Sequence, residues 1–227
     1  MAEADVDDVA LVAQRYLTIR GRVLFAEASK APGVVSIVAE PANGDPGLGL
    51  SVARTSRDDP TGTFELAGLK PGFYSLRVTP PDGWLLEAVS CGTPVCRGAS
   101  VDISTQEIDS ISIRLNDKQT QFIGLVRDQA GRPVVEVAIV LFPSEREQWR
   151  GYGFTPHRIR AVRVTEQGSA QISGMPAGRY LAAVVPLADI KAWQRPDYLD
   201  ELSKRAVSVT IQWGNETRIT FQKNTER

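Results

Sequence analysis

The sequence contains an internal repeat, and this repeat restricts the folds that the chain can adopt. Residues 61–74 align without gaps with residues 167–180: the three glycines of each segment coincide, and a tyrosine follows the last glycine at the same distance in both. A second pair of similar segments surrounds Gly21 and Gly124, which are 103 residues apart, close to the 106 residues that separate the first pair. A period of about 100 residues matches one β-sandwich domain.

Short runs of alternating apolar and polar residues predict strands along most of the chain. Residues 62–66 and 73–78 have this two-residue period, and turn-forming segments rich in glycine and proline, such as 41–47, separate the runs. Many short strands with few helical stretches indicate an all-β protein. We therefore expect two tandem β-sandwich domains, residues 15–116 and residues 117–227.

One segment of the second domain departs from the strand pattern. Leu199, Leu202 and Ala206 have the spacing of one helical face. We expect a short helical insertion near residues 197–206 that packs across an open end of a sheet.

The first 14 residues precede the repeat. Residues 5–13 have the same pattern as residues 107–115, which we expect to close the first domain as a strand. We interpret residues 1–14 as the closing strand of a preceding domain that is missing, or as an N-terminal extension. An amphipathic helix capped by Asp5 is the competing interpretation. A closing strand would make this chain part of a longer multidomain protein.

Composition and motifs argue against several classes of function. Lysine and arginine total 26 and aspartate and glutamate total 27, so the net charge of −1 gives no general attraction to nucleic acid or to an anionic membrane. The single histidine, His157, has no neighbouring zinc-ligand motif, and we find no nucleophile-elbow or phosphate-binding motif. We expect no enzymatic activity, no catalytic residue, no metal site, no cofactor and no direct membrane insertion.

Residues 62–74 resemble the signature of carboxypeptidase regulatory-like domains, Gly-x-Phe-x-Leu-x-Gly-Leu-x-Pro-Gly-x-Tyr. The second half is similar to such domains from bacterial multidomain proteins, although it departs from the signature at Ala170 and Ala177. The resemblance implies a prealbumin-like (transthyretin-like), Ig-like sandwich of seven strands. It also implies that no catalytic residue belongs to the sandwich.

Two cysteines are close together in the sequence. Cys91 and Cys96 flank a segment whose glycine and proline suit a turn, which can bring two Cα atoms within the distance that a disulfide needs. We expect a disulfide; two reduced thiols in a cytosolic protein are the alternative. Together with the usual setting of the resembling family, the pair predicts a periplasmic, cell-surface or extracellular location.

Aromatic and basic residues cluster in residues 149–160. They could form a ligand platform, with aromatic faces for sugar rings and arginines for acidic groups. They could instead be structural, with the tryptophan covering the sandwich and the arginines pointing outward along a strand. The candidate ligand-binding residues are Trp149, Tyr152, His157, Arg158, Arg160 and Trp193.

Tyr74 and Tyr180 occupy matching positions of the repeat. We expect each to be a corner residue, with a buried ring and a hydroxyl group bonded to the backbone.

These features predict a non-catalytic structural spacer and interaction module in a larger bacterial secreted or cell-envelope protein. The alternative is a carbohydrate- or peptide-binding module that uses the platform at residues 149–160. The expected partners are other domains of the parent protein and a cell-surface protein or glycan.

Overall fold

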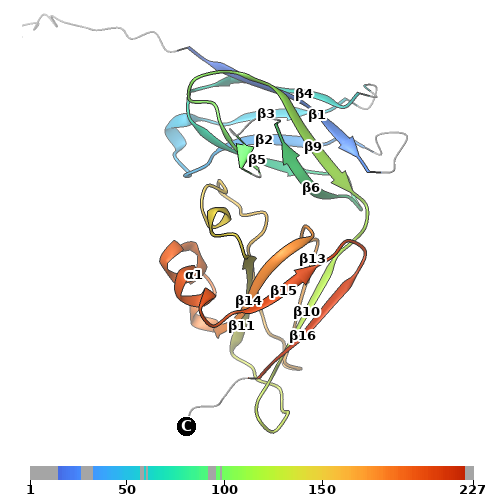
Figure 1. Cartoon of the computed structure of the whole chain (residues 1–227), viewed down its shortest axis with the longest axis vertical. Coiled ribbons are helices and arrows are strands. Elements are labelled where there is room, and N and C mark those ends of the chain that lie inside the picture. The colour runs from blue at the N-terminus through green and yellow to red at the C-terminus, as the bar shows by residue number, and fades with distance from the viewer. Residues whose placement is uncertain are drawn as a thin grey trace, which may run out of the picture.

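The computed structural model describes residues 15–26, 33–56, 59, 61–91, 96–97 and 99–222. It is an all-β structure with a few short helices, arranged as two sandwiches that follow one another along the chain (Figure 1). The prediction of an all-β fold is confirmed. The proposed closing strand at residues 5–13 lies outside the described residues. In the described ranges, no helix is both long enough and apolar enough to span a membrane.

The first sandwich consists of two facing sheets, with strand orders β4-β1-β9-β6 and β3-β2-β5-β8-β7. Strand β1 pairs in parallel with β9 and antiparallel with β4. Its elements are β1 (Leu17–Phe25), β2 (Ser36–Pro41), η1 (Pro46–Leu48), β3 (Ser51–Arg54), β4 (Thr63–Leu69), β5 (Phe73–Thr79), β6 (Leu85–Ser90), β7 (Cys96–Arg97), β8 (Ser100–Asp102) and β9 (Ile108–Asn116).

The second sandwich has sheets of order β13-β10-β16 and β12-β11-β14-β15. Here too the opening strand, β10, pairs in parallel with the closing strand, β16. Its elements are β10 (Gln121–Arg127), β11 (Val137–Pro143), η2 (Arg146–Trp149), β12 (Arg160–Arg163), β13 (Ser169–Ser173), β14 (Gly178–Pro186), η3 (Leu187–Asp189), η4 (Ala192–Gln194), α1 (Pro196–Ser203), β15 (Val207–Ile211) and β16 (Glu216–Gln222).

The sequence repeat corresponds to the same strand order in both halves; β6 and β7 are additions to the first. Gly62 and Gly168 explain part of the repeat, because both have positive φ, +63° and +68°. A β-carbon at either would also lie too close to the opening strand of its sandwich, 2.7 Å from the Val23 carbonyl oxygen or 2.8 Å from that of Val126. Independent folding of residues 15–116 and 117–227 stays a prediction.

Both repeat tyrosines are corner residues, as expected. Tyr74 and Tyr180 are fully buried. The Tyr74 hydroxyl donates to the Lys70 carbonyl at 3.0 Å, and the Tyr180 hydroxyl donates to the Pro176 carbonyl at 2.6 Å, four residues upstream in each case. Burial raises the pKa of both phenols.

The helical insertion is present, but it packs differently from our expectation. Leu199 and Leu202 of α1 are buried in a cluster with the outward-facing side chains of β11 and β14, so the helix covers a face of the sheet and not its open end. All seven residues of β11 are buried, because one side faces the sandwich core and the other faces this cluster. The helix ends at Ser203, which leaves room for β15 to begin pairing with β14 at Val207.

The predicted disulfide is confirmed. Cys91 and Cys96 are bonded, with their Cα atoms 5.9 Å apart. The bond joins the end of β6, in one sheet, to β7 at the edge of the other. It is therefore a local link between the two sheets of the first sandwich.

Candidate functional site: the cleft between the two sandwiches

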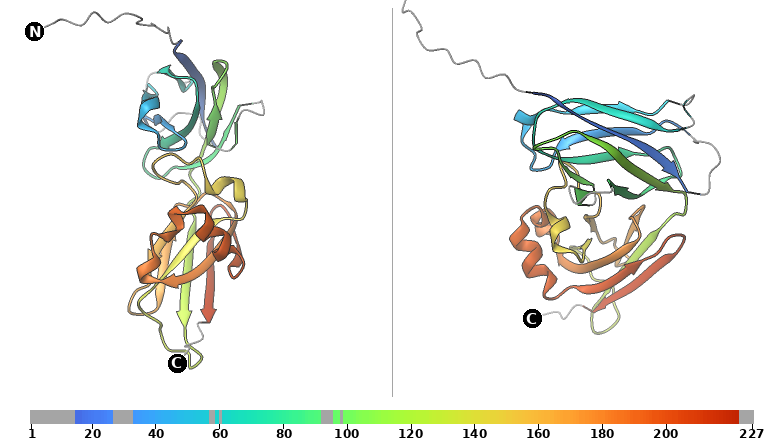
Figure 2. Two further views of the ribbon diagram at one scale, coloured as in Figure 1. Left: turned by 90° about the vertical axis from the view of Figure 1, so that its left-hand side faces the viewer. Right: turned by 45° about the horizontal axis from the view of Figure 1, so that its top comes forward.

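The segment after η2 lies against the first sandwich. In Figure 2 the yellow segment around η2 lies between the sandwiches in both views. Three hydrogen bonds fix residues 151–154 there: Ser100 Oγ donates to the Gly151 carbonyl at 2.7 Å, the Gly153 amide to the Ala42 carbonyl at 3.2 Å and the Phe154 amide to Glu40 Oε2 at 3.1 Å. We call residues 150–159 the docking loop.

Glu40 is the central polar group of this contact. Its side chain is 3% exposed, and a carboxylate buried to this degree needs partners. Arg77 of the neighbouring strand pairs with one oxygen, and the Phe154 amide donates to the other. Gly153 fits because it has a φ of +71° and because a β-carbon there would lie 2.7 Å from Glu40 Oε2.

The connection between the sandwiches supplies another contact. Gln119, between β9 and β10, donates from Nε2 to the Gly83 carbonyl at 2.6 Å. The second sandwich is thus attached to the first at the connection and at the docking loop.

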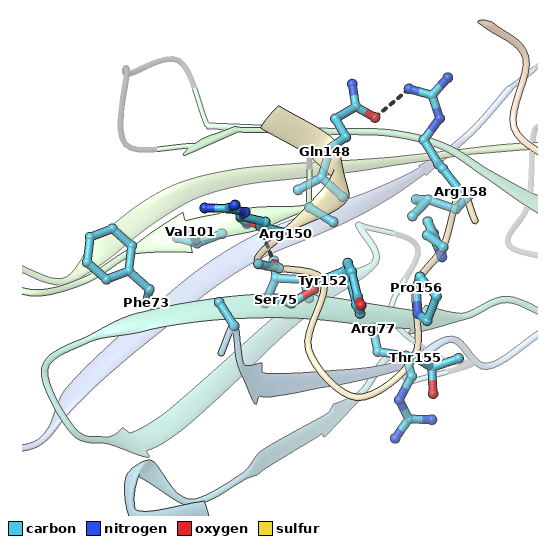
Figure 3. Close-up of a pocket in the computed structure, with 18 of the residues that line it drawn as sticks. Phe73, Ser75, Arg77, Val101, Gln148, Arg150, Tyr152, Thr155, Pro156 and Arg158 are labelled. Carbon is cyan, nitrogen blue, oxygen red and sulfur yellow. Dashed lines mark hydrogen bonds between the residues drawn. The ribbon is translucent and has the colours of Figure 1, made fainter. Parts of the chain in front are cut away.

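A cleft of about 980 Å³ lies between the docking loop and the first sandwich. Its walls include β5, β6 and β8 on one side and η2 with the docking loop on the other (Figure 3). Its volume is at the upper end of the range for ligand sites, and most of its lining is apolar. We take it as the candidate functional site.

Trp149 belongs to the core and does not present a surface for stacking. Its side chain is 5% exposed, its Nε1 donates to the Pro143 carbonyl at 2.8 Å, and its ring makes an edge contact with Phe142 at 5.5 Å between centroids. The structural alternative therefore describes Trp149 better than the ligand platform does.

Tyr152 and Trp193 are half-buried neighbours, with ring centroids 6.2 Å apart. Tyr152 lines the cleft, whereas Trp193 packs against the cluster beneath α1 and does not line the cleft. The structure thus brings the two rings together but leaves only one beside the candidate site.

Arg158 and Arg160 hold the docking loop together. Arg158 donates from Nε to the Tyr180 hydroxyl at 2.9 Å and from Nη1 to Gln148 at 2.7 Å, and its guanidinium lies 4.7 Å from the centre of the Tyr180 ring. Arg160 donates from Nη1 to the Pro156 carbonyl at 2.6 Å, and burial lowers its pKa. The structural alternative places the arginines along one strand, but β12 begins at Arg160, so Arg158 precedes the strand.

His157 lies at the cleft wall and is electrically neutral at pH 7. Burial lowers its pKa to about 4, and the positive charges of Arg160 and Arg158 act in the same direction. Its Nε2 is buried and has no hydrogen-bond partner in the part of the chain that the structure describes.

Sequence reasoning missed two residues of this region, Glu40 and Phe73. Arg150 belongs to the predicted platform at residues 149–160, although it is not among the candidate ligand-binding residues. Phe73 is 58% exposed at the cleft, and Arg150 lines the cleft without an ion pair or hydrogen bond to any described residue. A signal existed for both missed residues, because Glu40 is a charge at the end of an apolar strand and Phe73 is an aromatic residue at an outward position of the alternation. Across the same described ranges, no group of three or more His, Cys, Asp or Glu side chains could hold a metal ion.

This chain has low similarity to known proteins. No family model and no curated protein matches the chain. Similar solved structures include a minor pilin of Streptococcus agalactiae, with 14% identity over 93% of this chain and 97% of that chain and a TM-score of 0.40. The TIE protein of Bacillus anthracis is 15% identical over 92% of this chain and 34% of that chain, with a TM-score of 0.34; this chain thus spans about a third of its length. A major pilin subunit of Bacillus cereus is 11% identical over 94% of this chain and 71% of that chain, with a TM-score of 0.34. At such identities and TM-scores, none of these structures assigns a function to the chain.

Proposed function

We propose that this chain is a non-catalytic spacer and interaction module of a larger bacterial secreted or cell-envelope protein, in which it holds two sandwiches in a fixed relative orientation. The observation that carries the proposal is the docking loop of the second sandwich, bound to Glu40 of the first. A pair of domains joined only by a linker would reorient freely. Here the hydrogen bond and the ion pair of the buried carboxylate hold the two sandwiches in one relative orientation.

Two further features support the setting. A disulfide persists in oxidising compartments, so the Cys91–Cys96 bond favours the periplasm, the cell surface or the extracellular space. The signature at residues 62–74 and the seven-strand order common to both described halves support a place among carboxypeptidase regulatory-like domains. The partners of such a module are other domains of the parent protein.

Residual dipolar couplings of the whole chain test the fixed orientation. We expect the amides of both sandwiches to fit one alignment tensor in the wild-type protein. In Glu40→Ala and, separately, Gly153→Val, the two sandwiches should require different tensors while each remains folded. The second variant acts from the docking loop and leaves the first sandwich unchanged.

The matched control is Glu65→Ala, which removes an exposed carboxylate paired with Arg20 at 2.7 Å on the other sheet of the first sandwich. It should leave the single tensor unchanged. Two different tensors in the wild-type protein would overturn the proposal.

A further inference from the structure

The polar groups of the cleft differ in whether they have partners within the protein. Arg158, Arg77 and Ser100 also line the cleft, but each has a hydrogen bond within the protein. By contrast, His157 Nε2 and the Arg150 guanidinium bond to none of the described residues. The Arg150 side chain is exposed, so its charge is available to a ligand. His157 Nε2 is buried, and a buried unpaired nitrogen costs free energy.

The walls around these groups are mainly aliphatic, with one exposed aromatic ring. Phe73 stands beside the cleft, and in Figure 3 the Arg150 side chain extends toward it past Val101. The tryptophans that could stack on a sugar, Trp149 and Trp193, do not line the cleft. An aliphatic wall with few aromatic faces suits peptide side chains better than sugar rings.

The cleft also follows an edge strand. Four consecutive residues of β6, 86–89, line it, and β6 is the last strand of its sheet. In the described structure β6 pairs only with β9, so its other edge has unpaired backbone groups. The pairing with β9 slips between Leu86 and Ala88, so Glu87 forms a bulge in this edge.

We propose that the cleft binds an extended peptide segment of another protein, which adds a strand along β6, places an apolar side chain against Phe73 and pairs a carboxylate with Arg150. Backbone hydrogen bonds along an open edge with pockets for alternate side chains are a general mode of peptide recognition. The proposal rests on the fixed orientation of the two sandwiches, because residues of both line the cleft, and it goes beyond the spacer function by assigning a ligand.

The charges around the cleft limit which peptides fit. The cleft is lined by three acidic and three basic residues, so it gives no net attraction to a uniformly acidic segment: Glu87, Asp102, Glu147, Arg77, Arg150 and Arg158. The ligand should therefore carry one acidic residue at a fixed position within an otherwise apolar or neutral strand.

Selection from a phage-displayed library of random heptapeptides on the whole chain tests the proposal. We expect enriched peptides with one acidic position among apolar residues, and NMR shifts of the amides of residues 86–89 when the synthetic peptides are added. Affinity should fall about tenfold or more in Arg150→Glu, because a charge-assisted pair becomes a repulsion. It should fall at least severalfold in Phe73→Ala.

Two control variants match the changed side chains. Arg54→Glu reverses the charge of another exposed arginine, on β3, and Tyr16→Ala removes an aromatic ring that is 58% exposed, as Phe73 is, outside the cleft. Both should bind the peptides as the wild type does. The proposal is overturned if no peptide is enriched, if Arg150→Glu binds equally well, or if a glycan array gives binding that depends on the cleft while the peptide library gives none. Each of these results leaves the alignment tensors, and hence the spacer proposal, unaffected.

Discussion

Acidification should destabilise the protein through His157 before most carboxylates titrate. The ring has a pKa of about 4 in the folded chain and about 6.5 when unfolded. Between these values the unfolded state binds a proton that the folded state does not, so the free energy of unfolding falls as the pH drops from about 6.5 to 4. The full difference corresponds to at most about 3 kcal/mol, and partial solvent contact of the ring reduces it. Above about pH 6.5 this group makes no pH-dependent contribution.

The assay uses the fact that His157 is the only histidine. Its ring carbon–proton signals in an NMR titration report one residue without assignment ambiguity, and we expect them to stay in the neutral position down to about pH 5. Urea unfolding at pH 7.5 and pH 5 should show a loss of stability in the wild type that exceeds the loss in His157→Gln, since the carboxylate contribution is common to both.

A native-state titration of the ring near pH 6.5 would refute this reasoning, because the ring would then be solvated and not buried against two guanidinium groups. Equal losses of stability in the wild type and in His157→Gln would refute it as well.

Three other outcomes follow from the structure. Reduction of Cys91–Cys96 should lower the free energy of unfolding by about 2 kcal/mol, because the closed loop is small; global unfolding on reduction, followed by circular dichroism, would contradict this. Tyr180→Phe should lower the free energy of unfolding, measured with urea, by about 1–3 kcal/mol, since it leaves the buried Pro176 carbonyl without its donor. An unchanged midpoint of the urea transition would exclude a stabilising role of this bond. Residues 118–227 expressed alone should unfold in one cooperative calorimetric transition, because both hydrophobic clusters of this half contain only its own residues; a molten product would show that the halves depend on each other.

The sandwiches could be predicted from sequence because their signals are local. A turn glycine such as Gly62 and a corner residue such as Tyr74 are required by backbone geometry within a few residues, and the same requirement recurs in the second half. The disulfide was predictable for the same reason, since it closes a six-residue segment.

The site was harder to predict because its contacts are remote in sequence. Glu40 and Phe154 are 114 residues apart, and no periodicity relates them. Whether the Trp149 ring is buried or exposed likewise depends on tertiary packing, because the ring packs against the outward-facing side chains of β11. The unbroken apolar run of β11 was the one available sign that both faces of its sheet are covered, and α1 supplies the second cover.

The parallel pairing of opening and closing strands has a mechanical consequence. When a force stretches the chain, it pulls the start of β1 and the end of β9 in opposite directions along the pair from Ile19–Ile108 to Phe25–Leu115. The hydrogen bonds between them are then loaded together in shear and do not open one after another, and the seven residue pairs of β10 and β16 are loaded in the same way. Single-molecule pulling should therefore give high rupture forces for both sandwiches, whereas stepwise opening at low force would contradict this geometry. A chain built in this way transmits tension from one sandwich to the next while both stay folded.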